Sequence, residues 1–346
     1  MDSIVTRSVG RAMLLCLALT VSWPAGSAPA TVGTGPAAAF AAPEQAMDPE
    51  FRLAAVGYRL ALANSALCDN PVMLTGLMVH NIGDYAPRDR AAANAQYALT
   101  SGFGVLHVVG GSPADRAGLQ EGDEIVAVDG VSLARFHLDA IRTKASFDRT
   151  ETFVDDLEIA LAKGPASLTV RHQSDTAELV MPSQPGCGGR FAMIHQGAAD
   201  AWSDGSYVAV TEAMVRLAAD DSELAFVVAH EMAHNIAHDA DRKNPFGSLL
   251  LQFGLGAAPV KQAEIRADTA AVTFMANAGY DVAAPERLLR KSGGSHWMDL
   301  AITHPGIGRR ITIVRAAAAL VDPRLAAGQA VLKSEAGPYP AGTTIR

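Results

Sequence analysis

The segment His230-Glu231-Met232-Ala233-His234 places two imidazoles and a carboxylate at a spacing that can bind and use a zinc ion. Residues four apart on a helix lie on the same face, so both histidines can reach a single cation. Glu231 could then serve as the general base toward water at the open coordination position. Residues 224–229, just before the motif, are all apolar, which favours a buried helix over a solvated surface helix carrying two histidines. We therefore predict a zinc hydrolase site on this helix.

The third zinc ligand is expected on a second helix, at Glu264. The metzincin pattern would require a histidine at position 240, where this chain has alanine. A glutamate instead completes a His-His-Glu site and leaves the fourth position for water. Asp268 lies one helical turn after Glu264, where it can accept a hydrogen bond from the rear nitrogen of a ligating histidine. The alternative interpretation of this segment, with its helical pattern over 267–278, is an amphipathic helix with surface acids.

Four segments between residues 201 and 314 together resemble the gluzincin metallopeptidases of the HtpX, Oma and CAAX-prenyl-protease type. The segments are residues 230–235, 264–268 and 275–281, and Thr303-His304-Pro305 with Arg310-Ile311. The resemblance implies one zinc ion per chain, held by His230, His234 and Glu264, with Glu231 as the general base. It also implies that His304 stabilises the oxyanion of the reaction and that Arg310 supports this catalytic role.

The N-terminus is typical of a secretory signal peptide. Arg7 and Arg11 precede an apolar run, 12–23, that is too short to span a bilayer and is followed by small residues. We therefore expect a signal peptide over 1–42 and a periplasmic or secreted mature protein, with an uncleaved anchor as the alternative. Residues 245–260 are also too short and too interrupted by glycine to span a membrane, so we expect a soluble catalytic domain. Peripheral membrane contact is left open.

Removal of the signal peptide leaves Cys68 and Cys187 of the three cysteines. An even number of cysteines in an exported chain favours one disulfide between them. Such a bond would join the N-terminal helical segment to the start of the catalytic domain. Two buried free thiols are the alternative.

Residues 101–182 resemble a bacterial PDZ domain. An alternating apolar run is followed by Gly-Ser-Pro-Ala at 111–114 and by the pattern A-G-L-x-x-G-D-x-I-x-x-V-x-G at 117–130. The resemblance implies a module that adds a peptide to a sheet edge and holds its terminal carboxylate with backbone N–H groups of a Gly-rich loop. We assign that loop to Gly102, Phe103, Gly104 and Val105. The alternative is a small β-rich domain that packs against the peptidase without binding peptide.

These features predict an α+β protein in which a mainly helical gluzincin domain with a small sheet is combined with a β-rich PDZ domain. The expected parts are a signal peptide (1–42), an N-terminal helical part of the peptidase domain (43–98), a PDZ domain (99–184), the zinc metallopeptidase domain (185–322) and a C-terminal extension (323–346). The net charge of −8 and the lack of a basic patch argue against a nucleic-acid partner.

The predicted function is an exported zinc metalloendopeptidase that hydrolyses envelope proteins in quality control. Its partners would be protein or peptide substrates, received in part through their C-termini. A chaperone-like or assembly factor with latent proteolysis is the alternative from a different class, and a PDZ scaffold with a vestigial peptidase is a third. The complete catalytic set in the sequence favours the enzyme.

Overall fold

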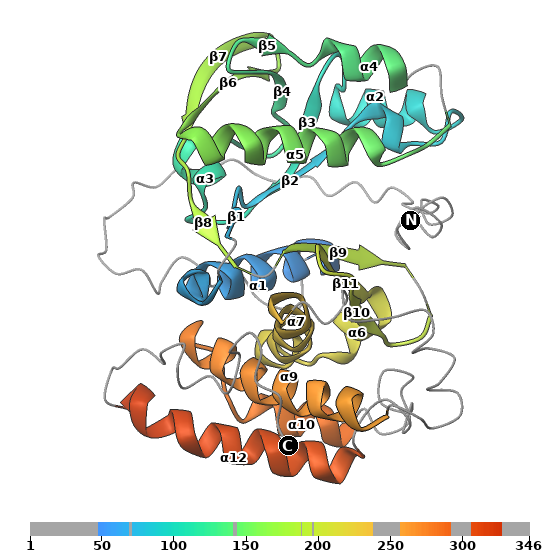
Figure 1. Cartoon of the computed structure of the whole chain (residues 1–346). Helices are drawn as coiled ribbons and strands as arrows, with labels where there is room; N and C mark the ends of the chain where they lie inside the picture. The colour runs from blue at the N-terminus through green and yellow to red at the C-terminus, as the bar shows by residue number, and fades with distance from the viewer. Residues whose placement is uncertain are drawn as a thin grey trace, which may run out of the picture.

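The computed structural model describes residues 48–68, 71–140, 144–187, 189–195, 197–237, 257–291 and 306–326. It consists of a mainly helical part, drawn in the lower half of Figure 1, and a β-rich part above it. The predicted α+β class is confirmed by this combination of helices and small sheets.

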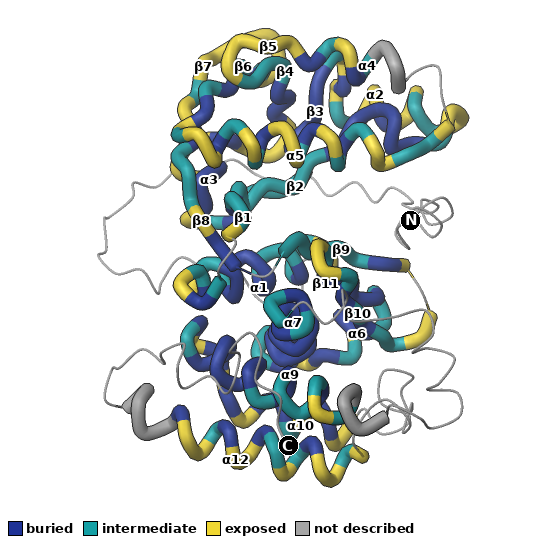
Figure 2. Tube along the Cα trace, in the orientation of Figure 1, coloured by how far each residue is buried: buried dark blue, intermediate teal, exposed yellow. Residues whose placement is uncertain are grey.

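Helix α7 (Asp221–Ile236) lies at the centre of the helical part. The side chain of Asp220 caps its first turn by accepting a hydrogen bond from Glu223 N at 2.9 Å. The acids of that turn also complement the positive end of the helix dipole. Every residue from Glu223 to Ala233 is buried, and Figure 2 shows α7 in dark blue between its neighbours. This helix is therefore packed on all sides along most of its length, and it carries the zinc motif.

The other helices of this part enclose α7. Helices α1 and α9 contact it directly, and α12 packs against α9 and α10. Their bounds are α1 (Pro49–Ala63), α6 (Glu212–Leu217), α9 (Ala257–Asn277), α10 (Ala284–Lys291) and α12 (Ile307–Ala326). Helix α9 begins earlier than the pattern over 267–278 predicted, and α12 continues into the segment expected to be a C-terminal extension from 323.

A small sheet of three strands completes the helical part. Strand β11 (Tyr207–Thr211) lies at its centre, antiparallel to β10 (Ala201–Ser203) and parallel to β9 (Arg190–Ile194). Strands β10 and β11 both contact α7, so the sheet lies next to the zinc-motif helix.

The β-rich part is an antiparallel sheet with the strand order β2-β3-β4-β6-β7 and the short β5 beside β4. Helix α5 (Asp148–Lys163) buries Phe153, Leu157 and Leu161 in the core of this domain. The strands are β2 (Leu77–His80), β3 (Phe103–Val108), β4 (Glu124–Val128), β5 (Val131–Ser132), β6 (Ala166–His172) and β7 (Asp175–Met181). The short helices of this part are η4 (Ile82–Asp84), α2 (Arg90–Tyr97), α3 (Pro113–Ala117) and α4 (Ala134–Ala140), whereas η3 (Ser65–Leu67) follows α1 and packs in the core of the helical part.

The boundary predicted between the peptidase part (43–98) and the PDZ domain (99–184) differs from the structure. Strand β2 belongs to the sheet of the β-rich domain, because Leu77 and His80 pair with Val108 and Gly104 of β3. Strand pairing is a non-local property, so a four-residue strand gives little signal in its own sequence.

A two-stranded ribbon joins the two parts. Strand β1 (Val72–Met73) pairs antiparallel with β8 (Pro185–Gly186). Beside the ribbon, a disulfide links Cys68 and Cys187, whose Cα atoms are 5.4 Å apart although 119 positions separate them in the sequence. The β-rich domain is therefore an insertion whose two ends lie side by side.

Several sequence predictions lie outside the described residues. These are the signal peptide over 1–42, His304, residues 245–256 of the glycine-interrupted segment, and the extension beyond Ala326. Within the described ranges, no helix combines the length and the apolar character needed to cross a bilayer.

Candidate active site

The two motif histidines lie one turn apart in the second half of α7, with ring centroids 5.0 Å apart. The side chain of His230 is fully buried, whereas that of His234 is 14% exposed. Both turn their Nε2 atoms toward Glu264 of α9, at 3.2 Å from Oε2 for His230 and 3.5 Å from Oε1 for His234. The structure therefore brings together the three side chains that the sequence predicted as ligands.

The donor set and its spacing fit a zinc ion. One atom from each of His230, His234 and Glu264 can be chosen so that all three lie within 4.8 Å of one another. Ligands about 2.0 to 2.1 Å from a tetrahedral zinc lie about 3.3 Å apart, and the two nitrogen–oxygen distances given above fall on either side of this value. Two imidazoles and a carboxylate also match the ligand set of hydrolytic zinc sites that keep one position open.

Asp268 lies behind the first histidine. Its Oδ1 is 3.0 Å from Nδ1 of His230, so the histidine can donate its Nδ1–H there and keep its Nε2 lone pair for a metal. Arg310 of α12 donates to the same carboxylate twice, from Nε to Oδ2 at 2.9 Å and from Nη2 to Oδ1 at 2.6 Å. Asp268 has no exposed surface and Arg310 is 1% exposed, so this bidentate ion pair is entirely buried.

This position corrects the role expected for Arg310, which was predicted among the catalytic residues. The guanidinium is committed to Asp268 and lies 3.5 Å from Nδ1 of His230, on the side away from the Nε2 atom that faces Glu264. Arg310 is therefore a positioning residue, which acts on the ligand shell through Asp268. His304, the residue predicted to contact the oxyanion, lies outside the described residues.

The charges at the site stabilise one another. Burial alone would raise the pKa of Asp268, but the nearby Arg310 and the hydrogen bond from His230 outweigh it and lower that pKa. Burial would likewise lower the pKa of His230, but its hydrogen bonds to Asp268 and Glu264 raise it. Asp268 is thus held ionised, as a hydrogen-bond acceptor for His230 must be.

Glu231 follows His230 directly in α7 and is 5% exposed. It is buried with the ligand set rather than solvated on an outer face. Its carboxylate adds to the negative charge that raises the pKa of Arg310, although burial of Arg310 opposes this effect and Asp268 is the larger contributor. A buried carboxylate adjacent to a ligating histidine has the chemistry required of a general base.

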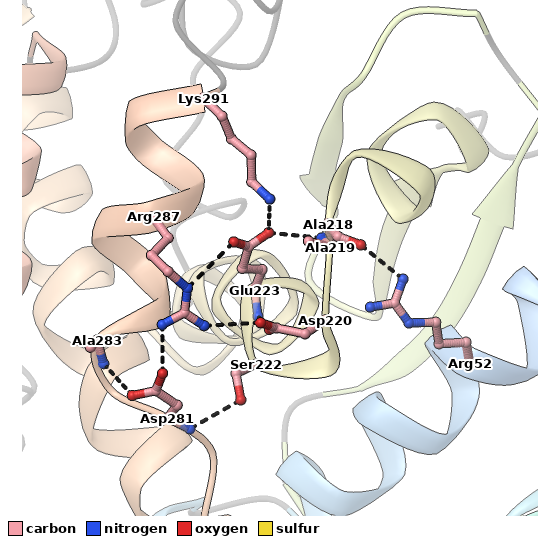
Figure 3. A network of polar contacts seen from close by, with 10 residues as sticks. All are labelled: Arg52, Ala218, Ala219, Asp220, Ser222, Glu223, Asp281, Ala283, Arg287 and Lys291. Carbon is pink, nitrogen blue, oxygen red and sulfur yellow. Dashed lines mark hydrogen bonds and ion pairs between the residues drawn. The ribbon is translucent and has the colours of Figure 1, made fainter. Parts of the chain in front are cut away.

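The N-terminal end of α7 is fixed by a separate polar network, shown in Figure 3. The carboxylate of Glu223, 3% exposed, accepts a hydrogen bond from Ala219 N and forms ion pairs with Arg287 and Lys291 of α10. Arg287 also donates to Asp220, the capping residue of α7, at 2.9 Å. One end of α7 is thus tied to α10 while the other end carries the histidines, which holds the ligands on a rigid element.

The predicted carboxylate-binding loop, Gly102, Phe103, Gly104 and Val105, is wrong. Residues 103–105 lie in β3, whose two edges are already paired with β2 and β4. A Cβ atom at Gly102 would lie 2.0 Å from the carbonyl oxygen of Ile125, and one at Gly104 would lie 2.5 Å from Nε2 of His80. These glycines therefore allow strands to pack closely, and they leave no room for a peptide.

Strand β2 lies at one edge of the sheet and pairs only with β3 within the described part of the chain, as β7 pairs only with β6 at the other edge. Gly76 precedes β2 with φ +66°, and a Cβ there would lie 2.1 Å from Cβ of Ser112. The carbonyls of Thr75 and Gly76 accept hydrogen bonds from Ala114 N and Val109 N. The signal for this loop was a glycine followed by the apolar run 77–79, which the sequence interpretation did not use.

Comparisons with known proteins agree with this architecture. Residues 172–258 match peptidase family M48, and residues 104–144 match the PDZ domain family. These matches indicate a zinc metallopeptidase domain of the M48 type and a PDZ domain. The M48 match includes both motif histidines and Glu231, whereas Glu264 lies beyond it.

The chain was also compared with solved structures and with curated protein sequences. One similar solved structure is the HtrA3 PDZ domain bound to a phage-derived ligand, FGRWV, at 22% identity and a TM-score of 0.25. The match covers 34% of this chain and 89% of that one. No curated protein sequence matches the chain.

Proposed function

We infer that this protein is an exported zinc metalloendopeptidase that hydrolyses peptide bonds of envelope proteins and uses its PDZ domain to receive their C-terminal tails. The observation that carries the proposal is the convergence of His230, His234 and Glu264, with Asp268 behind the first ligand and Glu231 beside it. This is a complete set of groups for hydrolysis at a metal with one open position.

The residues divide the chemistry among them. A zinc ion held by His230, His234 and Glu264 would polarise the scissile carbonyl and acidify water. Glu231 accepts the proton of the attacking water and passes it to the leaving amine. Asp268 fixes the tautomer and ring orientation of His230, and Arg310 keeps Asp268 ionised in its buried position. On the resemblance stated above, we assign the contact with the oxyanion to His304.

The PDZ domain would bind a peptide tail along β2. A strand added at this edge gains main-chain hydrogen bonds and would place its terminal carboxylate at the loop over residues 74–76. Leu77 and Val79 of β2 and Val154 and Ala160 of α5 are partly buried apolar residues at the core of this domain, and they can supply contacts for side chains of the tail. A tail held there would raise the concentration of substrate near the peptidase domain without taking part in the chemistry.

Export is supported by the N-terminal pattern and by the cysteines. A disulfide between Cys68 and Cys187 persists in an oxidising compartment such as the periplasm, and cytosolic thiols are kept reduced. The apolar run at 12–23, preceded by Arg7 and Arg11, supplies the features of a cleaved secretory signal. Protein and peptide substrates of the cell envelope are the partners that this location offers.

The test compares three forms of the mature protein. Glu231→Gln should keep its zinc, measured by elemental analysis, and lose at least about a hundredfold in the rate of casein cleavage. Glu212→Gln, a change on the surface where the side chain pairs with Arg216, is the matched control and should cleave as the unmodified protein does. Unaltered cleavage by Glu231→Gln would reject the mechanism. Full zinc with no cleavage in the unmodified protein, together with suppression of aggregation, would favour the chaperone-like alternative.

A further inference from the structure

The PDZ domain meets the peptidase domain at a second place besides the β1–β8 ribbon. The ribbon contains two residue pairs, Val72↔Gly186 and Met73↔Pro185. Beside it, α1 packs against Leu74 and Val109 of the PDZ domain, and the rings of Phe51 and His107 lie 4.8 Å apart. The second contact lies between α5 of the PDZ domain and the edge of the small sheet formed by β9 and β11. It consists of ion pairs and hydrogen bonds rather than apolar packing.

Arg190, the first residue of β9, makes most of this contact. Its Nε donates to Oε1 of Glu158 at 3.1 Å and its Nη2 donates to Oε2 at 2.9 Å, so the pair is bidentate. Nη2 also pairs with Asp155, one turn earlier in α5. The side chains of Arg190 and Glu158 are 23% and 21% exposed, which shields this ion pair from solvent more than most surface pairs.

Tyr207 of β11 extends the contact along the same face of α5. It lies directly opposite Arg190 in the parallel pairing of β9 and β11. Its hydroxyl donates to Oε1 of Glu151 at 3.2 Å and accepts from Nη1 of Arg190 at 3.3 Å. Glu151, Asp155 and Glu158 are spaced four and three residues apart, so they line one face of the helix. Three acids of α5 therefore hold two residues of the peptidase sheet.

The backbone of Tyr207 continues the connection to the zinc-motif helix. Nδ2 of Asn235 donates to the carbonyl oxygen of Tyr207 at 3.1 Å, and its Oδ1 accepts from Gly205 N at 2.7 Å. Asn235 is 5% exposed and directly follows the ligand His234. Gly189 closes the packing, because a Cβ there would lie 2.4 Å from the carbonyl oxygen of Ser206 and 3.3 Å from Nδ2 of Asn235.

We propose that Arg190, Tyr207 and Asn235 form a positioning joint that couples the PDZ helix α5 to the zinc-binding end of α7, so that a peptide tail docked beside α5 raises kcat at the zinc site. The joint runs without interruption from the acids of α5, through the Tyr207 side chain and backbone, to the residue after His234. Its members contact α5, the turn over residues 204–207 and one another, so they act through the placement of that turn and of the adjacent His234.

We expect kcat to rise rather than fall because a bound tail reduces the mobility of α5 and of the residues it contacts. A strand added at β2 restricts α5, which forms the other wall of the tail-binding region, and thereby restricts the three acids that hold Arg190 and Tyr207. A better-fixed Tyr207 keeps Asn235 and the adjacent ligand in one geometry, which is the condition for rapid reaction. The inference rests on the proposed peptide-binding role of the PDZ domain, and it goes beyond that role because tethering alone would change KM for tailed substrates and leave kcat on small peptides unaltered.

The experiment uses the mature full-length protein loaded with zinc and a short fluorogenic peptide, amidated at its C-terminus, as substrate. The effector is a separate six-residue peptide that ends in Ile-Val with a free carboxylate, and its amidated form serves as the inactive counterpart. Binding of the effector is measured by fluorescence anisotropy, and kcat and KM of the substrate are measured with and without saturating effector. Zinc content is determined for every variant.

We expect the effector to raise kcat at least about fivefold in the unmodified protein, the lower range of typical allosteric coupling, with little change in KM. Arg190→Gln should bind the effector equally well and retain its zinc, but respond less than twofold, and Arg190→Lys should recover part of the response. Arg135→Gln is the matched control, because Arg135 pairs at 3.0 Å with Asp156 of the same helix but lies within the PDZ domain. This variant should respond fully.

Three outcomes would overturn the inference. If the effector binds but leaves kcat unchanged in the unmodified protein, the PDZ domain only tethers substrate and the coupling is absent. If Arg190→Gln responds as fully as Arg135→Gln, coupling exists but does not pass through this joint. If no effector binds, the proposed role of the PDZ domain fails and the inference falls with it, whereas the peptidase activity is tested separately by Glu231→Gln.

Discussion

Replacing Arg310 by methionine gives the most direct measure of how the buried ion pair supports the site. The change removes the guanidinium but keeps an apolar side chain of similar length, so Asp268 remains fully buried without its cation. Removing one partner of a buried pair costs about 3 to 5 kcal/mol, because the remaining charge is uncompensated. For a domain of about 150 to 250 residues each kcal/mol lowers the melting temperature by about 2 to 4 °C, so we expect a decrease of about 10 °C.

Zinc binding should weaken in the same variant. Asp268 orients His230, and the loss of such a supporting group typically lowers metal affinity about 10- to 100-fold. Calorimetry and titration with a zinc chelator measure the two effects independently. Arg309→Met is the matched control, because Arg309 is the exposed neighbour on the same helix and should change neither quantity.

A second change separates charge from shape. In the Arg310→Met background, Asp268→Asn removes the uncompensated charge but keeps an oxygen that can accept the Nδ1–H of His230. The double variant should therefore recover about half of the lost stability, roughly 2 kcal/mol. The reasoning is refuted if Arg310→Met loses less than about 1 kcal/mol, or if Asp268→Asn in its background destabilises the protein further.

Three further outcomes follow from the structure. His234→Ala should lose most of the bound zinc, whereas His195→Ala, a change at an exposed histidine, should retain about one ion per chain by elemental analysis; equal zinc in both would reject the ligand assignment. Burial raises the pKa of Asp84 to about 7, so the folded state favours the protonated side chain. The stability that this side chain contributes is full below about pH 4 and is lost as the pH rises through 7. Asp84→Asn should therefore gain thermal stability relative to the unmodified protein between pH 4 and pH 8, by at most about 4 kcal/mol, and a pH-independent difference would contradict the shift. Cys187→Ser opens the bond to Cys68, and with 119 positions between them the chain-entropy estimate is a loss of about 5 kcal/mol in denaturant unfolding; an unchanged midpoint would contradict it.

The site residues that lie one turn apart on a single helix could be predicted from the local sequence. The spacing of His230 and His234 follows from the helical repeat, and the apolar run before them required the burial that α7 shows. Glu264 and Asp268 could be paired with them because they also lie one turn apart. The position of Arg310 was not accessible in this way, because it depends on how α12 packs against α9 and not on any pattern within α12.

The PDZ domain shows the same limit for strands. The glycines at 102 and 104 resembled a binding loop, but their role is set by Ile125 and His80 on neighbouring strands. Strand β2 has four residues and is separated from its partner β3 by η4 and α2, so its alternation is too short to identify it as the edge of the sheet. Only the pairing across the sheet decides which strand is open to a peptide.

The adjacent ends of the inserted domain have a consequence for how the chain folds. Helix α1 must pack against α7, although the whole PDZ domain is synthesised between them. Closing so long a loop of unfolded chain is entropically costly and slow, whereas a PDZ domain that has already folded brings residues 72 and 186 together as directly paired neighbours. Once the PDZ domain has folded, the entropic cost of bringing the flanking parts of the peptidase domain together is close to that of closing a short turn. During synthesis the PDZ domain is complete before α7 has been made. Helix α1 therefore lies next to a folded PDZ domain before it can pack against α7.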